Sequence, residues 1–161
     1  MNKYKRHVYV IPEDDADRQI ADGFVLHHHI DSRQIQVMPI ARGWPNVLST
    51  FRDEYIQILQ NNPQSHVVMI IDFDGHTDDR RAKFENEVPE QLRARVYVVG
   101  AKDTPEVLKN SLNLSFEKIG RALAEDCDGD TTEHWDHEQL QHNDAERERL
   151  VQTVKPFLFV P

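Results

Sequence analysis

Carboxylate side chains follow two apolar segments of this chain of 161 residues. The apolar residues 67–71 run into Asp72 and Asp74, two acids that stand one residue apart. An earlier apolar segment, HVYVIP, runs into Glu13, and Asp17 comes four residues later. Carboxylate oxygens without cysteine or a histidine cage are ligands that favour Mg²⁺ or Mn²⁺. A cation held there would orient a phosphodiester and stabilise its developing charge, so the pattern indicates phosphodiester chemistry.

A third polar group follows the apolar residues 94–100 and contains Lys102, Asp103 and Glu106. Loops that follow parallel strands share one edge of a sheet, and ligands usually bind at that edge. We therefore expect the three groups to converge, where their mutual repulsion would raise pKa values unless a cation lay among them. Aspartate is also common in solvated turns and in the first turn of helices, and Asp78 and Asp79 fit that alternative.

The hydrophobic periodicity predicts strands at residues 7–11, 34–40, 66–72 and 94–100. It predicts helices at about 15–26, 44–60, about 79–92, 105–112, 115–125 and 138 to about 154, with a loop at 125–133. Apolar strands separated by helices are typical of a parallel sheet that is covered on both faces. The expected fold is α/β, with a four-stranded, mainly parallel sheet, helices on both faces and a helical C-terminal extension.

One domain is expected over residues 1–161, with a core at about 5–112 and the extension at about 113–161. The apolar tail VKPFLFVP is expected to dock on the body or, with the C-terminal helices, on a protein partner. No apolar run approaches the roughly 18–20 residues that cross a bilayer, and the N-terminus lacks the pattern of a secretory signal. We therefore expect a cytoplasmic protein with no membrane contact.

Charge and cysteine content narrow the function classes. The net charge of −9 disfavours tight, non-specific binding of DNA, because such proteins usually display a basic face. A single cysteine, Cys127, excludes an internal disulfide and a four-cysteine zinc site. Its acidic neighbours in the sequence are expected to raise the pKa of the thiol, which argues against a reactive nucleophile.

The order of the acidic motifs resembles the TOPRIM domain of topoisomerases, primases and OLD-type nucleases. The first motif of that family is an apolar strand followed by glutamate, glycine, two further residues and an acid. Here VYVIPEDDAD places Glu13 and Asp17 at the two acids and Asp14 at the glycine. The second motif, an apolar strand followed by Asp-x-Asp, matches VVMIIDFDG. The resemblance covers residues 7–100 and implies a TOPRIM-like fold.

The resemblance also implies site residues and an activity. Asp72 and Asp74 would bind Mg²⁺ or Mn²⁺ together with Asp17, while Glu13 would act as a metal ligand or as the general acid/base. In OLD-type nucleases, acids and a lysine beyond the later strands complete a two-metal site, and the residues placed for that role are Lys102, Asp103 and Glu106. The expected function is metal-dependent cleavage of phosphodiesters in nucleic acid.

Two other functions fit parts of the sequence. A catalytically silent TOPRIM-like module that binds a partner in a multi-protein system is supported by the net charge of −9 and the apolar tail. The run DFDGHT also resembles the Asp-x-Asp-Gly-Thr motif of haloacid-dehalogenase-type phosphatases, in which Asp72 would be the nucleophile. Three features of this chain depart from the phosphatase pattern. His76 is inserted before Thr77, about 65 residues precede a motif that normally follows an early strand, and Glu13 has no role in that function.

Two groups of histidines could also bind metal. His134 and His137 would share one face of a helix and, with His142, could hold zinc. The alternative is a polar helix start with Trp135 packed inward. The three histidines at residues 27–29 lie at the end of the first predicted helix and complement its dipole. A nickel-type site there would need partners that the sequence does not identify.

Overall fold

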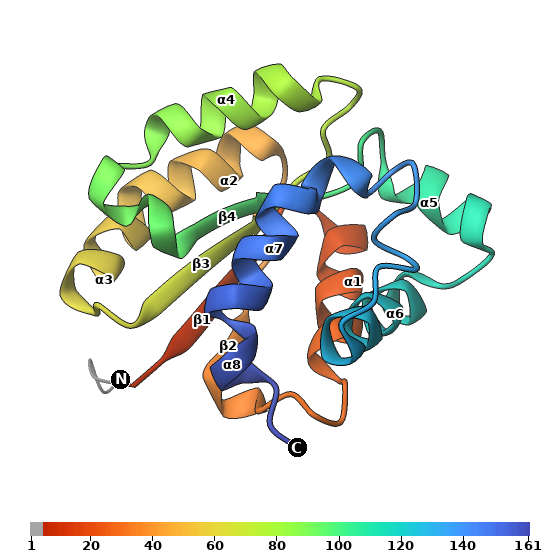
Figure 1. The fold of residues 1–161 in the computed structure, drawn as a ribbon. Coiled ribbons are helices and arrows are strands. Elements are labelled where there is room, and N and C mark those ends of the chain that lie inside the picture. Colours follow the sequence, from red (N-terminus) through yellow and green to blue (C-terminus); the bar gives the residue numbers. More distant parts are fainter. Residues whose placement is uncertain (1–4) are drawn as a thin grey trace.

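The computed structural model describes residues 5–161, and Figure 1 shows its sheet lying between layers of helices. Within these residues the sheet has four strands, all parallel, in the order β2-β1-β3-β4. The strands are β1 (His7–Pro12), β2 (Ile35–Val37), β3 (Ser65–Ile70) and β4 (Val96–Val99). The predicted α/β fold with helices on both faces is confirmed.

The two central strands are buried on both faces, as their continuous apolar sequences indicate. Successive side chains of a strand point to opposite faces, so each strand contributes to two separate clusters. Tyr9 and Met69 belong to the cluster on one face, and Val8 and Val68 belong to the cluster on the other. The sheet therefore needs helices on both sides, and the chain supplies them.

The first face is covered by α2 (Trp44–Thr50), α3 (Ile56–Asn61) and α4 (Thr77–Glu87), as Figure 1 shows. The predicted helix at 44–60 is continuous in the chain, but a π-helical turn at Phe51–Tyr55 joins α2 to α3. The predicted helix at 79–92 is α4, which ends at Glu87, ahead of Pro89; the sequence predicts that this proline ends or bends the helix, because it cannot donate a helical hydrogen bond. A 3₁₀ helix at Glu90–Arg95 then leads into β4.

The second face is covered by α1 (Asp15–Val25), α6 (Phe116–Gly129), α7 (Asp144–Thr153) and α8 (Lys155–Leu158). Two glycines bring α1 and α6 into backbone contact. A Cβ atom on Gly23 would lie 2.0 Å from the carbonyl oxygen of Glu117, and one on Gly120 would lie 1.9 Å from that of Ile20. Only glycine fits at these two positions, so the distance between the two helices is set by the sequence.

The segment after residue 112 differs from its predicted boundaries. The helix α5 (Pro105–Leu112) has its predicted bounds, but α6 runs to Gly129 and not to 125, so Cys127 lies in a helix and not in a loop. The buried side chains Ile119, Leu123 and Cys127 are spaced four residues apart. This spacing continues the apolar face of the helix through the acidic part of its sequence. The next helix, α7, begins at Asp144 after a short 3₁₀ turn at Gln141–Asn143 and not at 138.

The apolar tail docks on the body of the protein, which was one of its two predicted positions. Phe157 and Leu158 are buried in the cluster on the second face of the sheet. An isolated bridge joins Phe159 to Ile30, just ahead of a 3₁₀ turn at Ser32–Gln34. No helix in the described part of the chain is long and apolar enough to cross a membrane.

Candidate metal centre at the edge of the sheet

Four carboxylates meet beyond the ends of β1 and β3, and we call them the carboxylate cluster. One oxygen from each lies within 4.8 Å of the others, and the four residues are Glu13, Asp14, Asp17 and Asp72. Three of them, Glu13, Asp17 and Asp72, are among the metal ligands expected from the sequence. The parallel arrangement of β1 and β3 brings them together across 59 residues of chain between Glu13 and Asp72.

Backbone geometry positions each member of the cluster. The N–H of Glu13 donates to the carbonyl oxygen of Ile70 (2.9 Å), which extends the pairing of β1 with β3 by one residue. The Oε2 atom of Glu13 then accepts from the N–H of Asp72 (2.7 Å). Asp14 caps the N-terminus of α1, where its Oδ1 accepts from the N–H of Asp17 (3.0 Å). Glu13 thus ties the two strand ends together, and Asp14 orients the first turn of the helix.

Two oxygens of the carboxylate cluster are buried and unpaired. Asp17 is 1% exposed. Within residues 5–161, neither Oδ2 of Asp17 nor Oδ1 of Asp72 has a hydrogen-bond donor when both groups are ionised. An unpaired buried carboxylate is costly, so it is normally compensated by a proton or a cation. The cluster is therefore built to take up positive charge.

The pKa values of the cluster also indicate that it takes up positive charge. Burial raises the pKa of Asp17 well above its ordinary value, and the charges of Asp72 and Asp14 add to the rise. Burial also raises the pKa of Asp72 to about 8, helped by Asp14 and Glu13 and partly opposed by a hydrogen bond with Asp17. The pKa of Glu13 is raised by burial, against the hydrogen bond from the Asp72 backbone. The cluster thus holds a proton at neutral pH when no cation neutralises it.

Asp74, a predicted metal ligand, lies outside the carboxylate cluster. Its Oδ2 accepts from Nη1 of Arg80 (2.7 Å), and the same nitrogen donates to the carbonyl oxygen of Asp72 (2.9 Å). The backbone at Asp74 is left-handed, with φ at +50°, which turns its side chain away from the direction that the strand would give. Its charge still contributes to the raised pKa of Glu13, so the two acids remain neighbours.

The predicted residues after β4 also lie outside the cluster. The Oδ2 atom of Asp103 accepts from Nε2 of Gln139 (2.7 Å), and its N–H donates to Oε1 of the same side chain (2.8 Å). Lys102 is 43% exposed at its side chain, with Nζ 3.9 Å from Glu138, and Glu106 is exposed in the first turn of α5. Their roles as ligands or as a catalytic lysine stay predictions.

Cations and an aromatic ring stand beside the carboxylate cluster. The guanidinium of Arg80 lies 4.7 Å from the ring centroid of Trp44, and Nζ of Lys83 lies 5.2 Å from it. The exposed Arg42 donates its N–H to the carbonyl oxygen of Glu13 (2.8 Å). An anionic substrate that approached the cluster would therefore meet positive side chains at its rim.

The three C-terminal histidines do not form one site. His134 lies 3.7 Å from a carboxylate oxygen of Asp126, whereas Nε2 of His137 bonds to the hydroxyl of Ser111 (2.9 Å). His142 is held by the carbonyl oxygen of Gly100 (2.9 Å) and so belongs to the packing beneath the sheet edge. Residues 131–140 form turns and not a helix, which removes the spacing on which the predicted zinc site depended.

Asp14 is the member of the cluster that sequence reasoning did not place among the ligands. It stands where the resemblance expects a glycine, and its role as an N-cap was the available signal. No family model matches the chain, and neither does any curated protein or solved structure. The resemblance to TOPRIM domains therefore stays a prediction from the sequence motifs.

Proposed function

We propose that this protein binds Mg²⁺ or Mn²⁺ in the carboxylate cluster and cleaves phosphodiesters of nucleic acid. The observation that carries the proposal is the convergence of two buried, unpaired oxygens, Oδ2 of Asp17 and Oδ1 of Asp72, beside Glu13. Two unit charges 4.8 Å apart repel by about 3–4 kcal/mol at an effective dielectric constant of about 20. A divalent cation would relieve that repulsion for several pairs at once.

The donor set suits a small, hard cation. Asp17 and Asp72 would bind it through their unpaired oxygens, and Asp14 has one oxygen left after capping α1. Oxygen ligands of this kind select Mg²⁺ or Mn²⁺ over softer metals. When bound, such an ion polarises a phosphodiester and lowers the pKa of a bound water.

The chain's own side chains would divide the remaining work. Glu13 positions Asp72 through the 2.7 Å hydrogen bond to its backbone, and burial raises the pKa of Glu13, which favours its role in proton transfer. Lys83 is exposed and lies over the ring of Trp44, and the backbone of the exposed Arg42 bonds to Glu13, so both are available to neutralise substrate phosphates. The resemblance to TOPRIM domains supports the same roles for Glu13 and Asp72.

A second candidate function is a binding or regulatory module that uses the same fold without catalysis. The TOPRIM resemblance assigns Asp74 and Lys102 to the catalytic site, but Asp74 is paired with Arg80 and Lys102 lies beside Glu138. Because both side chains interact elsewhere, the structure favours this second function at these two positions. In that function the carboxylate cluster takes up a proton or a cation for stability alone, and the protein acts through a protein partner.

Nicking of supercoiled plasmid DNA in Mg²⁺ or Mn²⁺ tests the proposal, with single-stranded DNA and RNA as further substrates. Wild-type protein is expected to nick, Asp72→Asn and Asp17→Asn are expected not to, and the exposed Asp79→Asn should match the wild type. Activity that survives in both cluster variants refutes the site. Binding of Mg²⁺ without cleavage of any of the three substrates favours the second candidate.

A further inference from the structure

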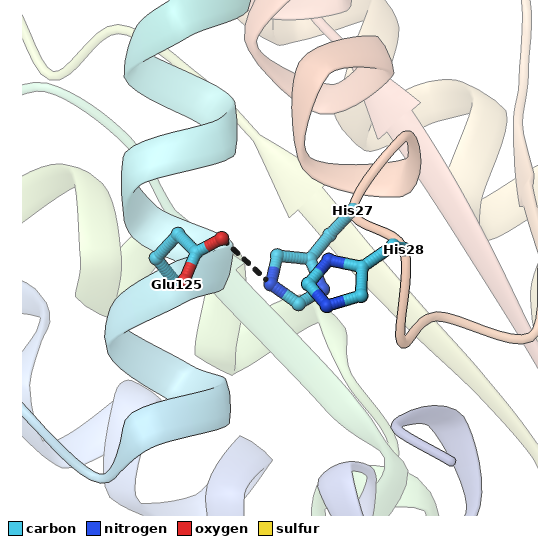
Figure 2. Close-up of side chains that lie close together, drawn as sticks. All are labelled: His27, His28 and Glu125. Carbon is cyan, nitrogen blue, oxygen red and sulfur yellow. Dashed lines mark ion pairs between the residues drawn. The ribbon is translucent and has the colours of Figure 1, made fainter. Parts of the chain in front are cut away.

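A second group of potential metal ligands lies at the other end of α1 from the carboxylate cluster. Asp17 is in the first turn of α1, and three histidines follow its last turn, so the length of the helix, about 16 Å, separates the two groups. The last turns of α6 face these histidines and contribute Glu125 and Asp128. Figure 2 shows the rings of His27 and His28 beside Glu125 on the neighbouring helix.

We propose that His27, His29 and Asp128 form a binding site for a late first-row divalent ion such as Zn²⁺, with His28 and Glu125 at hand as further ligands. Imidazole nitrogens combined with a carboxylate are a ligand set typical of zinc and its neighbours and not of Mg²⁺. This site is independent of the function proposed for the carboxylate cluster.

The distances between donor atoms fit one small ion. Nε2 of His27 lies 3.1 Å from Oε1 of Glu125 and 3.8 Å from Oδ2 of Asp128, and Nδ1 of His29 lies 2.8 Å from the same Oδ2 atom. Ligands about 2.0–2.1 Å from a tetrahedral zinc are about 3.3 Å apart. The donor atoms of His27, His29 and Asp128 all lie within 4.8 Å of one another, and the two distances to Oδ2 of Asp128 fall on either side of this spacing of about 3.3 Å. Small rotations of the partly exposed His29 and Asp128 therefore suffice to close the site, whereas Glu125 forms a neighbouring group with His27 and His28.

His27 has the burial expected of an anchoring ligand. Its side chain is 1% exposed, and its Nε2 atom makes no hydrogen bond although it faces carboxylate oxygens. Its ring packs against His28 at 4.6 Å and against Phe159 of the tail at 5.7 Å between centroids. A buried imidazole nitrogen that makes no hydrogen bond within residues 5–161 but lies at ion-pair distance from a carboxylate marks a position for positive charge, either a proton on the ring or a bound cation.

The scaffold around the site is fixed on both sides. The close contacts at Gly23 and Gly120 set the distance between α1 and α6. The tail holds the histidine turn from below, since Val160 donates its N–H to the carbonyl oxygen of His29 (2.7 Å) and Phe159 pairs with Ile30. Ligands from the histidine turn and from α6 are thus held next to each other by close packing, as a preorganised site requires.

Metal binding would shift a proton within the histidine turn. The N–H of His29 donates to Nδ1 of His27 (3.1 Å), so the neutral ring of His27 carries its proton on Nε2. An ion at Nε2 displaces that proton, the ring then keeps its one proton on Nδ1, and the N–H of His29 loses its acceptor. Zinc should therefore change the tautomer of His27 and expose the amide of His29 to exchange.

The test uses the full chain without a histidine tag and Co²⁺ as a spectroscopic substitute for Zn²⁺. We expect one Co²⁺ per chain to give visible absorption bands that Zn²⁺ abolishes and Mg²⁺ does not. His29→Ala and Asp128→Asn should each weaken binding by at least about tenfold, since even outer-shell groups of metal sites are worth about 10–100-fold. Both side chains are partly exposed, at 35% and 25%, so both variants should fold.

Two controls make the result specific. His134→Ala removes a histidine with a similar exposure, 27%, from a different group of acids, and Asp72→Asn alters the carboxylate cluster; both should bind Co²⁺ like the wild type. NMR of the wild type should report the change of tautomer at His27 when Zn²⁺ is added. The proposal is overturned if the bands are absent, if they persist in both site variants, if they vanish in His134→Ala, or if the ring of His27 is unchanged in saturating Zn²⁺.

Discussion

Replacing Asp72 with asparagine is expected to make the metal-free protein more stable at alkaline pH. The pKa of Asp72 is raised from 3.8 to about 8 in the folded protein. Folded protein therefore holds this proton more tightly than the unfolded chain does, so the free energy of unfolding falls as the pH rises from about 4 to about 8. Asparagine keeps the shape of the neutral acid and cannot ionise, so the variant escapes that loss.

The size of the effect follows from the same two pKa values. A difference of one in pKa corresponds to about 1.4 kcal/mol, so the full difference would be worth about 6 kcal/mol. The carboxyl group is partly exposed, and solvent screening reduces the figure to about 3 kcal/mol, of which about 2 kcal/mol falls between pH 5 and pH 8. Asp72→Asn should thus be about 1 kcal/mol more stable than the wild type at pH 5 and about 3 kcal/mol more stable at pH 8.

Urea unfolding in EDTA, followed by tryptophan fluorescence at several pH values, measures this difference directly. Subtracting the wild-type free energy from that of the variant cancels the titration of groups that do not interact with Asp72. The exposed Asp79→Asn should give a difference that does not vary with pH. A difference for Asp72→Asn that stays constant from pH 5 to pH 8 refutes the argument, because Asp72 would then ionise normally.

Adding Mg²⁺ at pH 8 should remove most of the advantage in stability that Asp72→Asn has over the wild type. A ligand that binds only the folded state at 100 times its Kd stabilises it by about 2.7 kcal/mol, and the wild type should gain such an increment. Asp72→Asn has lost a ligand and should gain little. An equal gain in both proteins would place the bound ion elsewhere.

Further predictions concern the core. Burial lowers the pKa of His66 to about 4, so its contribution to stability should be lost as the pH falls from about 6.5 to about 4, and His66→Phe should flatten acid unfolding over that range. Gly23→Ala should lower the free energy of unfolding in urea by more than about 3 kcal/mol, because its Cβ would lie 2.0 Å from a carbonyl oxygen. Gly129→Ala should be neutral or stabilising by up to about 1 kcal/mol, because no described atom lies within 4 Å of its Cβ. Burial raises the pKa of Cys127 to about 11, so a thiol reagent should label it only after unfolding.

Three outcomes would contradict these predictions. An acid-unfolding curve of the same shape in His66→Phe would mean that this histidine protonates freely in the folded state. Equal effects of the two glycine substitutions would mean that α1 and α6 can separate at little cost. Rapid labelling of Cys127 in the folded protein would mean that the end of α6 opens readily.

The fold could be predicted from the sequence because the strands are apolar on both faces and the helices are not. That contrast also located Glu13 and Asp72, since both stand one or two residues beyond a buried parallel strand. The exclusion of Asp74 could not be predicted, because it depends on a left-handed backbone at that residue and on the side chain of Arg80. Neither feature has a local pattern in the sequence.

The partners of the histidine turn were missed for a related reason. Asp128 is 99 residues from His29 in the sequence, and it belongs to an acidic segment that the sequence predicts to be a loop. The helix continues through that run because Cys127 fills the next buried position after Leu123, and one small apolar residue is a weak signal against its charged neighbours. A boundary error of one helical turn thus hid the acids that face the histidines.

Two aspartates in the first turn of α1 show what separates a structural acid from a candidate ligand. Asp15 is exposed, and hydrogen bonds from Arg18 and Gln19 lower its pKa. Asp17 lies on the stripe that the helix turns toward the sheet, in line with Ala21 and Phe24, where an apolar residue would be expected. A carboxyl group kept at such a position must take up a proton or a cation, and the stability measurements with and without Mg²⁺ distinguish the two.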